Sequence, residues 1–334
     1  MATYKGILGY SVQTVASDPS PTASAEGQVW YNSTSGTYKI AIAAGGAWAA
    51  GNDLNLGKGE MGSAQTGTQT ACMIFGGDAP PGTSPPGYLD ETEQYNGTAW
   101  TEVADLVRGR SQVGGLGTNT AAMCVAGNYP TDTNYDELWD GTSWTEIANT
   151  LAARAGGAAT GTTTAALMCG GSWNPTGGRM TNCETWDGTS WTEGNDILVA
   201  TVYAGVVGST TSALMFAGQV AGGALTTDET ATYNGTSWTE VNDLNTARYG
   251  NGKFGTVTTA MCVGGTYNPG NSALTEQYDG TSWTEVGDIT TARSSVGSAG
   301  TSALGLIAGG NPGYLTATEE WADPTYAIKT VTTS

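Results

Sequence analysis

Apolar residues occur in short runs that end at glycine. AMCVGG at 260–265 and ALMFAG at 213–218 are examples, and their length indicates short buried strands. Mostly polar stretches with an aromatic residue read as two further strands: ETEQY at 91–95 ends in the aromatic, and SWTEV at 237–241 carries the Trp. Asn-Gly or Asp-Gly joins the strand that ends in the aromatic to the strand that carries the Trp, and it is a strong hairpin signal. No segment of useful length has a helical period, so we expect an all-β protein.

One unit of this pattern recurs along the chain. Trp occupies positions 100, 144, 191, 238 and 283, so that the spacings are 44, 47, 47 and 45 residues. An aromatic residue lies five positions before each of these Trp residues, and a Gly that closes an apolar run lies 27 positions after it. A period of about 40–50 residues predicts propeller blades, here of four strands each. One unit cannot bury its own faces, whereas a closed ring of units can.

Two series of residues recur with the unit and predict packing between strands and blades. The first series is Trp48, Trp100, Trp144, Trp191, Trp238 and Trp283. The second series lies ten residues after a Trp and comprises Arg110, Arg154, Arg248 and Arg293, with Lys58 and Thr201 at the remaining positions. The Arg residues could stack on the indole rings or pair with the acidic residue found five positions after most of the Trp residues. The sequence leaves these alternatives open.

The order apolar run, Gly pair, aromatic, Trp and Arg resembles the kelch repeat over about residues 48–326. This resemblance implies a β-propeller of six or seven kelch-like blades, with Gly pairs that close the second strand. A second resemblance lies in EGQVWYNSTSGTYKIAIAAGGAW at 26–48. Together with the repeats, this segment is similar to kelch-like structural proteins of marine bacteriophage particles, often tail fibres.

The number of blades depends on how the N-terminal strands are used. Six Gly-terminated second strands are clear, and Thr325–Val331 reads as the fourth strand of the sixth unit. We therefore favour seven blades, of which the first, at 27–54, is degenerate. The alternative is six blades at 55–334, with Trp48 closing the last blade and the N-terminal strands as a separate β-hairpin module. Residues 1–26 read as an extended arm that could anchor the ring to a larger assembly.

Composition narrows the classes of function. The chain has 334 residues, no His and a net charge of −19 with only 11 Lys and Arg. The absence of His removes His-dependent triads and metal sites, and the absence of a basic cluster argues against nucleic acid as a partner. No apolar run is long enough for a membrane helix, and the first residues lack a signal-peptide core. We therefore expect no cofactor, no metal and no membrane insertion.

The five Cys residues are widely spaced and predict no dense disulfide framework. Four of them, Cys72, Cys124, Cys169 and Cys262, lie in the apolar runs, where they read as small buried hydrophobic residues.

The most variable segments run from the closing Gly to the next aromatic residue, with lengths of 18, 12, 15, 15, 13 and 11 residues. They occupy the same place in every blade, so we expect them on one face, where a rigid scaffold displays recognition loops. Flat rings and amides suited to sugar or protein surfaces lie there, namely Tyr88, Tyr129, Trp173, Asn174, Tyr267, Asn268 and Tyr314.

These features favour a non-enzymatic structural or adhesion protein of a phage particle: a fibre, a head appendage or a capsid decoration. The expected partners are other virion proteins, held through the N-terminal arm, and a glycan or protein of the host surface. Such a protein would be assembled in the host cytoplasm and released by lysis. The alternative is a stand-alone carbohydrate- or protein-binding module in a bacterial cell. Paired carboxylates for an enzyme occur too regularly to single out one pair.

Overall fold

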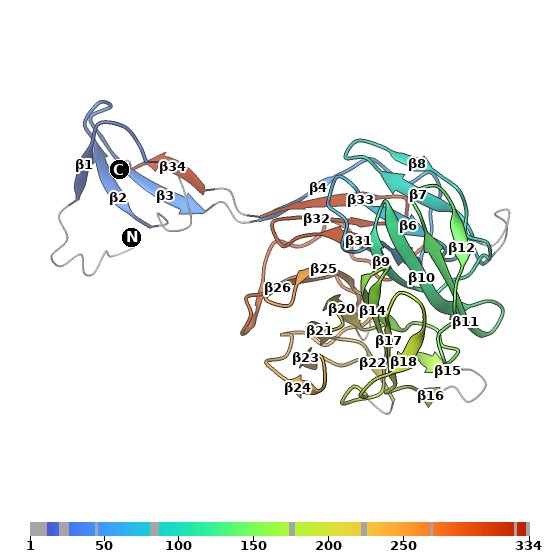
Figure 1. Ribbon diagram of the computed structural model, residues 1–334. Helices are drawn as coiled ribbons and strands as arrows, with labels where there is room; N and C mark the ends of the chain where they lie inside the picture. Colours follow the sequence, from blue (N-terminus) through green and yellow to red (C-terminus); the bar gives the residue numbers. More distant parts are fainter. Residues whose placement is uncertain are drawn as a thin grey trace. The chain divides into compact units, whose positions relative to one another are not determined.

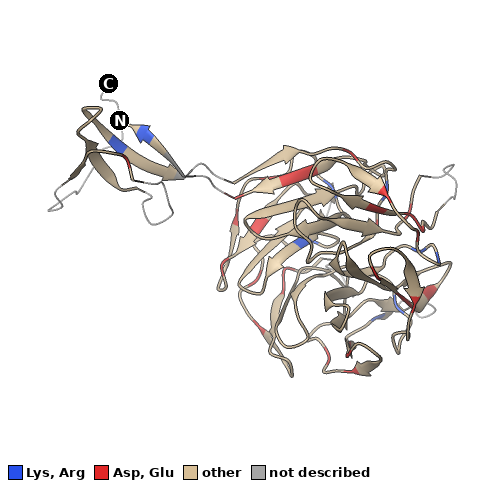
Figure 2. Ribbon diagram, turned by 45° about the horizontal axis from the view of Figure 1, so that its top comes forward, with Lys and Arg blue, Asp and Glu red and all other residues tan. Residues whose placement is uncertain are grey.

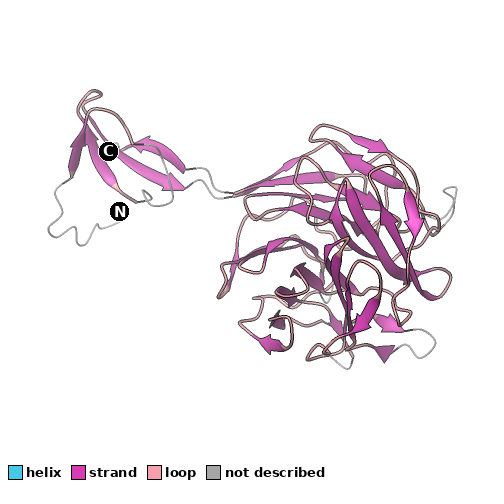
Figure 3. Ribbon diagram, in the orientation of Figure 1, coloured by secondary structure: helices cyan, strands magenta, loops and turns pink. Residues whose placement is uncertain are grey.

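The computed structural model describes residues 12–19, 27–43, 46–80, 87–173, 178–221, 226–267, 270–323 and 326–331. All regular elements in these ranges are strands, as Figure 3 shows, so the all-β prediction is confirmed. The residues fall into two compact units. Unit 1 comprises Met1–Ala47 and Asp323–Ser334, and unit 2 comprises Trp48–Ala322.

Unit 2 is a β-propeller whose blades are sheets of four antiparallel strands, many of which are labelled in Figure 1. Blade 1 contains β5 (Gly62–Ser63), β6 (Met73–Phe75), β7 (Thr92–Tyr95) and β8 (Trp100–Glu102). Blade 2 contains β9 (Gly114–Thr118), β10 (Ala121–Asn128), β11 (Asp132–Trp139) and β12 (Trp144–Glu146). Blade 3 contains β13 (Ala158–Thr162), β14 (Ala165–Cys169), β17 (Cys183–Trp186) and β18 (Trp191–Glu193).

The second half of the propeller repeats this order. Blade 4 contains β20 (Gly205–Gly208), β21 (Ala213–Phe216), β23 (Thr230–Tyr233) and β24 (Trp238–Glu240). Blade 5 contains β25 (Gly252–Thr256), β26 (Thr259–Val263), β29 (Thr275–Tyr278) and β30 (Trp283–Glu285). Blade 6 contains β31 (Gly297–Gly300), β32 (Leu304–Ala308), β33 (Thr318–Ala322) and β4 (Ala47–Ala50).

Three short two-stranded sheets each contain a strand that directly follows the second strand of a blade. They are β15 (Ser172–Trp173) with β16 (Gly178–Arg179), β19 (Thr201–Val202) with β22 (Gln219–Val220), and β27 (Thr266–Tyr267) with β28 (Gly270–Asn271).

A closed ring of backbone hydrogen bonds joins the six blades. Each ring residue lies just before the first strand of its blade, has a φ between 54° and 66°, and donates its N–H to the carbonyl of the ring residue before it. The first residue donates to the last, with N–O distances of 2.6–3.1 Å around the ring. The ring residues are Glu60, Gln112, Gly156, Tyr203, Gly250 and Ser295.

This ring and the strand order do not confirm a degenerate seventh blade at 27–54. The N-terminal strands are divided between the two units: β4, which carries Trp48, completes blade 6, whereas β2 and β3 belong to unit 1. The pattern of polar and apolar residues in a strand shows which of its faces is buried, but it does not show which sheet the strand joins. The six-blade alternative describes this strand order.

Unit 1 contains one four-stranded sheet of β1 (Gln13–Val15), β2 (Val29–Asn32), β3 (Thr37–Ala43) and β34 (Tyr326–Thr330). The segment Thr325–Val331 was expected to be the fourth strand of the sixth unit. This expectation is wrong, because β34 pairs with β3 of unit 1. The described part of the expected arm is also not free. In it, β1 pairs in parallel with β2, and Asp18 accepts hydrogen bonds from Trp30 Nε1 at 2.9 Å and from Asn32 at 2.7 Å.

The repeated Trp side chains pack between neighbouring blades of the propeller. In four of the six cases the indole Nε1 donates to a Thr hydroxyl at the start of the third strand of the preceding blade. These bonds are Trp100 to Thr318 (3.0 Å), Trp144 to Thr92 (3.0 Å), Trp283 to Thr230 (3.1 Å) and Trp48 to Thr275 (3.2 Å). A buried indole contributes a large apolar area, and here its polar group is satisfied as well.

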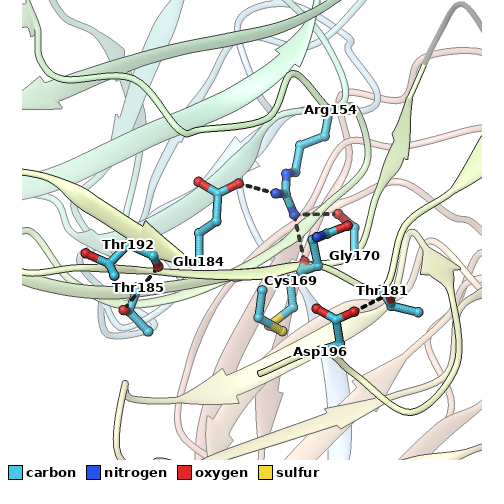
Figure 4. The surroundings of a disulfide bond; sticks show 10 residues. Arg154, Cys169, Gly170, Thr181, Glu184, Thr185, Thr192 and Asp196 are labelled. Atoms are coloured by element: carbon cyan, nitrogen blue, oxygen red, sulfur yellow. Dashed lines mark hydrogen bonds and ion pairs between the residues drawn. A yellow bond between two sulfur atoms is a disulfide. The ribbon is translucent and has the colours of Figure 1, made fainter. Parts of the chain in front are cut away.

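Two blades depart from this Trp–Thr pattern. Blade 2 has Asp136 at the Thr position, and its carboxylate accepts the backbone N–H groups of Ala126 (2.9 Å) and Thr150 (2.8 Å). Blade 3 has Cys183 there, in a disulfide with Cys169, which is its cross-strand neighbour on β14 (Figure 4). Cys169 is buried as expected, but its interpretation as a small hydrophobic residue is wrong, because its sulfur is bonded to Cys183. Among the described residues, Trp238 Nε1 has no hydrogen-bond partner, since a disulfide offers no hydroxyl.

The repeated basic residues form buried ion pairs within their own blades. Each pairs with a Glu that lies two residues before the third-strand aromatic, and neither of the two alternatives expected from sequence applies. The pairs are Lys58–Glu93 (2.9 Å), Arg110–Glu137, Arg154–Glu184 (Figure 4), Arg248–Glu276 (2.8 Å) and Arg293–Glu319. The Glu lies on the same strand face as the buried aromatic residue, because side chains two apart share a face.

Candidate functional site

A pocket of about 360 Å³ lies beside the central ring, where loops of blades 2, 3 and 4 meet. We call it the loop-face pocket. Its lining residues are Gln112, Asn128, Asp132, Ser172, Trp173, Arg179, Val202, Tyr203 and Gln219. Two of them, Gln112 and Tyr203, are ring residues, so the propeller backbone fixes them in place.

The walls of the pocket are built from short, well-defined elements. Trp173 and Arg179 lie on β15 and β16, which pair Trp173 with Gly178 and so hold both side chains on one hairpin. Asn128 and Asp132 face each other across the end of the β10–β11 hairpin, where Asn128 Nδ2 donates to Asp132 Oδ1 at 2.9 Å. The pocket therefore sits on strand ends rather than on long loops.

The polar groups of the pocket are positioned by hydrogen bonds. Arg179 Nε donates to the carbonyl of Gln219 at 2.9 Å, which fixes the plane of the guanidinium. Gln112 Nε2 donates to Glu60 Oε2 at 2.9 Å. Burial raises the pKa of the Tyr203 phenol, and the charges of Glu60 and Asp132 add to this effect, so the phenol stays protonated and can donate.

Acidic groups near the central ring are shifted toward their neutral forms. Burial raises the pKa of Glu60, partly opposed by the hydrogen bond from Gln112. Burial, followed by the charge of Glu60, raises the pKa of Asp78 to about 6. A small cavity of about 60 Å³ lies against the ring and is lined in part by Lys253, whose pKa is lowered to about 8 by burial. Figure 2 shows that the Asp and Glu positions are spread over several blades.

The aromatic residues expected to bind a ligand fall into different environments. Trp173 lines the loop-face pocket and is 47% exposed. Tyr88 and Tyr129 contact each other edge to face, with ring centroids 5.3 Å apart. Tyr314 donates its hydroxyl to Asp78 at 3.2 Å. Tyr267 is exposed on the β27–β28 hairpin. The other two expected residues, Asn174 and Asn268, lie outside the described residues.

Most of the pocket was not predicted from the sequence. The variable segments pointed to Trp173, but not to its polar neighbours. One signal was present: Tyr203 lies two residues after the irregular Thr201, at the repeat position of Glu60 and Gln112. The remaining members come from three blades and different parts of the repeat, so no local pattern joins them.

No group of three or more Cys, Asp or Glu in the described residues could hold a metal ion. The same part of the chain contains no helix that could span a membrane.

Comparison with solved structures shows the fold. The chain is similar to the protein in "Structure of YjhT", one of 233 matching chains, with a TM-score of 0.64 and 13% sequence identity. The match covers 84% of this chain and 99% of that one. No protein-family model and no curated protein sequence match. Together with the four-stranded sheets, the likeness supports the β-propeller.

Proposed function

We propose that this chain is a non-enzymatic glycan-binding protein of a bacteriophage particle, carried as a fibre, a head appendage or a decoration. The observation that supports glycan binding most directly is the loop-face pocket. Its volume of about 360 Å³ lies within the range of ~300–1,000 Å³ that is usual for small-molecule sites.

The chemistry of the pocket suits a sugar. Trp173 and Tyr203 provide flat faces for the C–H surface of a pyranose ring. Asp132 accepts hydrogen bonds from vicinal hydroxyl groups, and Arg179 donates two in one plane. Because β15, β16 and the central ring hold these groups, little ordering entropy is lost on binding.

The division of the chain supports a role in display. The segment that resembles phage structural proteins lies mainly in unit 1, whereas the pocket lies in unit 2. One unit can therefore serve as the attachment to a particle while the other carries the recognition loops. The repeats contribute a rigid scaffold on which loops vary without loss of the fold.

Glycan binding is tested on a glycan array followed by calorimetry with the best ligand. We expect Trp173→Ala to weaken binding at least tenfold without a change in thermal unfolding, because the side chain is half exposed. Tyr267→Ala is the matched control, since Tyr267 is an exposed aromatic that does not line the pocket. Loss of binding in the control alone, or equal affinity in all three proteins, would refute this site.

The particle assignment is tested separately with an antibody and gold label on intact phage. Label on the tail tips indicates receptor binding, and label on the head indicates decoration or a head-borne adhesin. If the protein is found in the lysate but not on particles, the virion assignment is wrong and an intracellular binding module replaces it.

A further inference from the structure

Blade 4 lacks the buried ion pair found in the other five blades. Thr201 occupies the position of the Arg or Lys, and Ala231 occupies the position of the Glu. Both partners are missing together, so no unpaired buried charge remains. Loss of only one partner would have left such a charge, at a cost of ~3–5 kcal/mol.

A cavity of about 60 Å³ remains where the pair would lie. We call it the blade 4 slot, and define it by Val199, Thr201, Met215, Ala217, Glu229 and Ala231. The slot shares no residue with the loop-face pocket. Solvent reaches it, because Leu198 beside it is 53% exposed and Ala231 is partly exposed, whereas the Glu residues at the position of Ala231 in other blades are fully buried.

The slot has the carbonyl groups that bind a guanidinium elsewhere in the propeller. In blade 3, Arg154 Nη1 donates to the carbonyl of Gly170 at 3.0 Å and to that of Asn182 at 2.9 Å. In blade 4 the same repeat positions are Ala217 and Glu229, and both line the slot. The backbone is thus arranged for a cation that no described residue supplies.

Glu229 provides a carboxylate at the edge of the slot. In blade 1 the same position is Glu91, which lies 3.5 Å from Lys58 Nζ, so a carboxylate there can reach the cation. Glu229 has no ion pair with any described residue. Burial raises its pKa, and nearby negative charges, first that of Glu240, raise it further, so a cation would relieve repulsion at this site.

We propose that the blade 4 slot binds an arginine side chain of a partner polypeptide. The aliphatic stem packs against Met215 and Val199, the guanidinium donates to the carbonyl groups of Ala217 and Glu229, and the Glu229 carboxylate pairs with the charge. Lys fits less well, since a guanidinium makes several hydrogen bonds in one plane, whereas an ammonium is a compact charge.

Two acetylated pentapeptides test the slot: Gly-Gly-Arg-Gly-Gly, and the same peptide with citrulline, the uncharged isostere, in place of Arg. Binding is followed by NMR through the indole N–H resonance of Trp238, which lines the cavity. We expect saturable binding of the arginine peptide and at least tenfold weaker binding of the citrulline peptide. Equal binding of the two peptides would mean that the cavity takes up the side chain without recognising its charge, and it would overturn the proposal. Failure of the arginine peptide to bind would overturn it as well.

Three variants locate the binding. Ala231→Leu should abolish it by filling a partly exposed position, and Glu229→Gln should weaken it at least threefold. Glu285→Gln removes an exposed carboxylate of blade 5 and should bind as the unmodified protein does. Binding that persists in Ala231→Leu, or that falls equally in Glu285→Gln, would place the site elsewhere. Restoring the pair with Thr201→Arg and Ala231→Glu should also exclude the peptide.

Discussion

The buried pair of blade 5 allows the energetics of these ion pairs to be measured. Arg248 and Glu276 are almost fully buried, their charged atoms are 2.8 Å apart, and Glu276 also accepts two hydrogen bonds from Asn245. Arg248→Thr leaves a buried carboxylate, and Glu276→Ala leaves a buried guanidinium. Each single variant should lose about 3–5 kcal/mol of the free energy of unfolding.

The double variant reproduces what blade 4 contains at this position. Neither charge remains, and the main cost is a cavity, for which the blade 4 slot of about 60 Å³ provides the size. At ~24 cal/mol per Å³ this cavity costs about 1.4 kcal/mol. The carbonyl of Cys262, which loses its donor, adds about 1 kcal/mol. We therefore expect the double variant to lose about 2–3 kcal/mol, less than half of the sum of the single losses.

Urea unfolding of the four proteins provides the measurement, provided that the denaturant slopes agree. The control cycle uses Arg108 and Glu146, which form an ion pair at 2.6 Å but are each nearly half exposed, and should couple by less than about 1 kcal/mol. If the losses in blade 5 add within error, or if each single loss is below about 1 kcal/mol, the assignment of the pair as a buried, mutually compensating unit is wrong.

Three further predictions concern single features of the propeller. Removing the disulfide with Cys169→Ala and Cys183→Ala should cost about 3 kcal/mol, from the entropy of a closed loop of 14 residues, and should remove any effect of dithiothreitol on the melting temperature. Burial raises the pKa of Asp136 to about 7, so this carboxyl group keeps its proton to a higher pH in the folded state than in the unfolded state. The free energy of unfolding therefore falls as the pH rises from about 4 to about 7. Asp136→Asn should remove this fall, which unfolding at several pH values measures; a difference between variant and parent that is independent of pH would contradict the shift. Gly305→Ala should lower the free energy of unfolding by about 1–3 kcal/mol, because a Cβ there would lie 2.2 Å from Phe254 Cζ. An unchanged urea midpoint would contradict this packing.

The repeat predicted the fold because each blade carries its information locally. The Trp period, the Gly-terminated run and the Asn-Gly or Asp-Gly turn lie within one unit of about 45 residues, so they can be recognised without knowledge of the neighbours. The Glu partner of the buried Arg is also local, two residues before the aromatic. The sequence alone does not single it out, because acidic residues are frequent along the third strands and only burial separates Glu93 from Glu91.

Long-range pairing explains what the sequence did not show. The strand at Trp48 could join an N-terminal blade or the last blade, and its own residues are compatible with either. The disulfide depends on Cys169 and Cys183 being cross-strand neighbours, which requires the register of β14 and β17. The loop-face pocket depends on strand ends and ring residues from three blades, which are far apart in the sequence. In each case the decisive information is a contact between distant residues rather than a local pattern.

The strand order of unit 1 has a mechanical consequence. Because β3 and β34 are neighbours in one sheet, the propeller is an insertion: the chain leaves unit 1 after β3 and returns to it before β34. The propeller is thus tethered at both of its ends. A protease that cuts one of the two connections leaves the other intact, and a pulling force applied through unit 1 is divided between two covalent connections. Release of the propeller requires a cut in both connections, or a cut between β3 and β4 together with separation of β34 from its sheet.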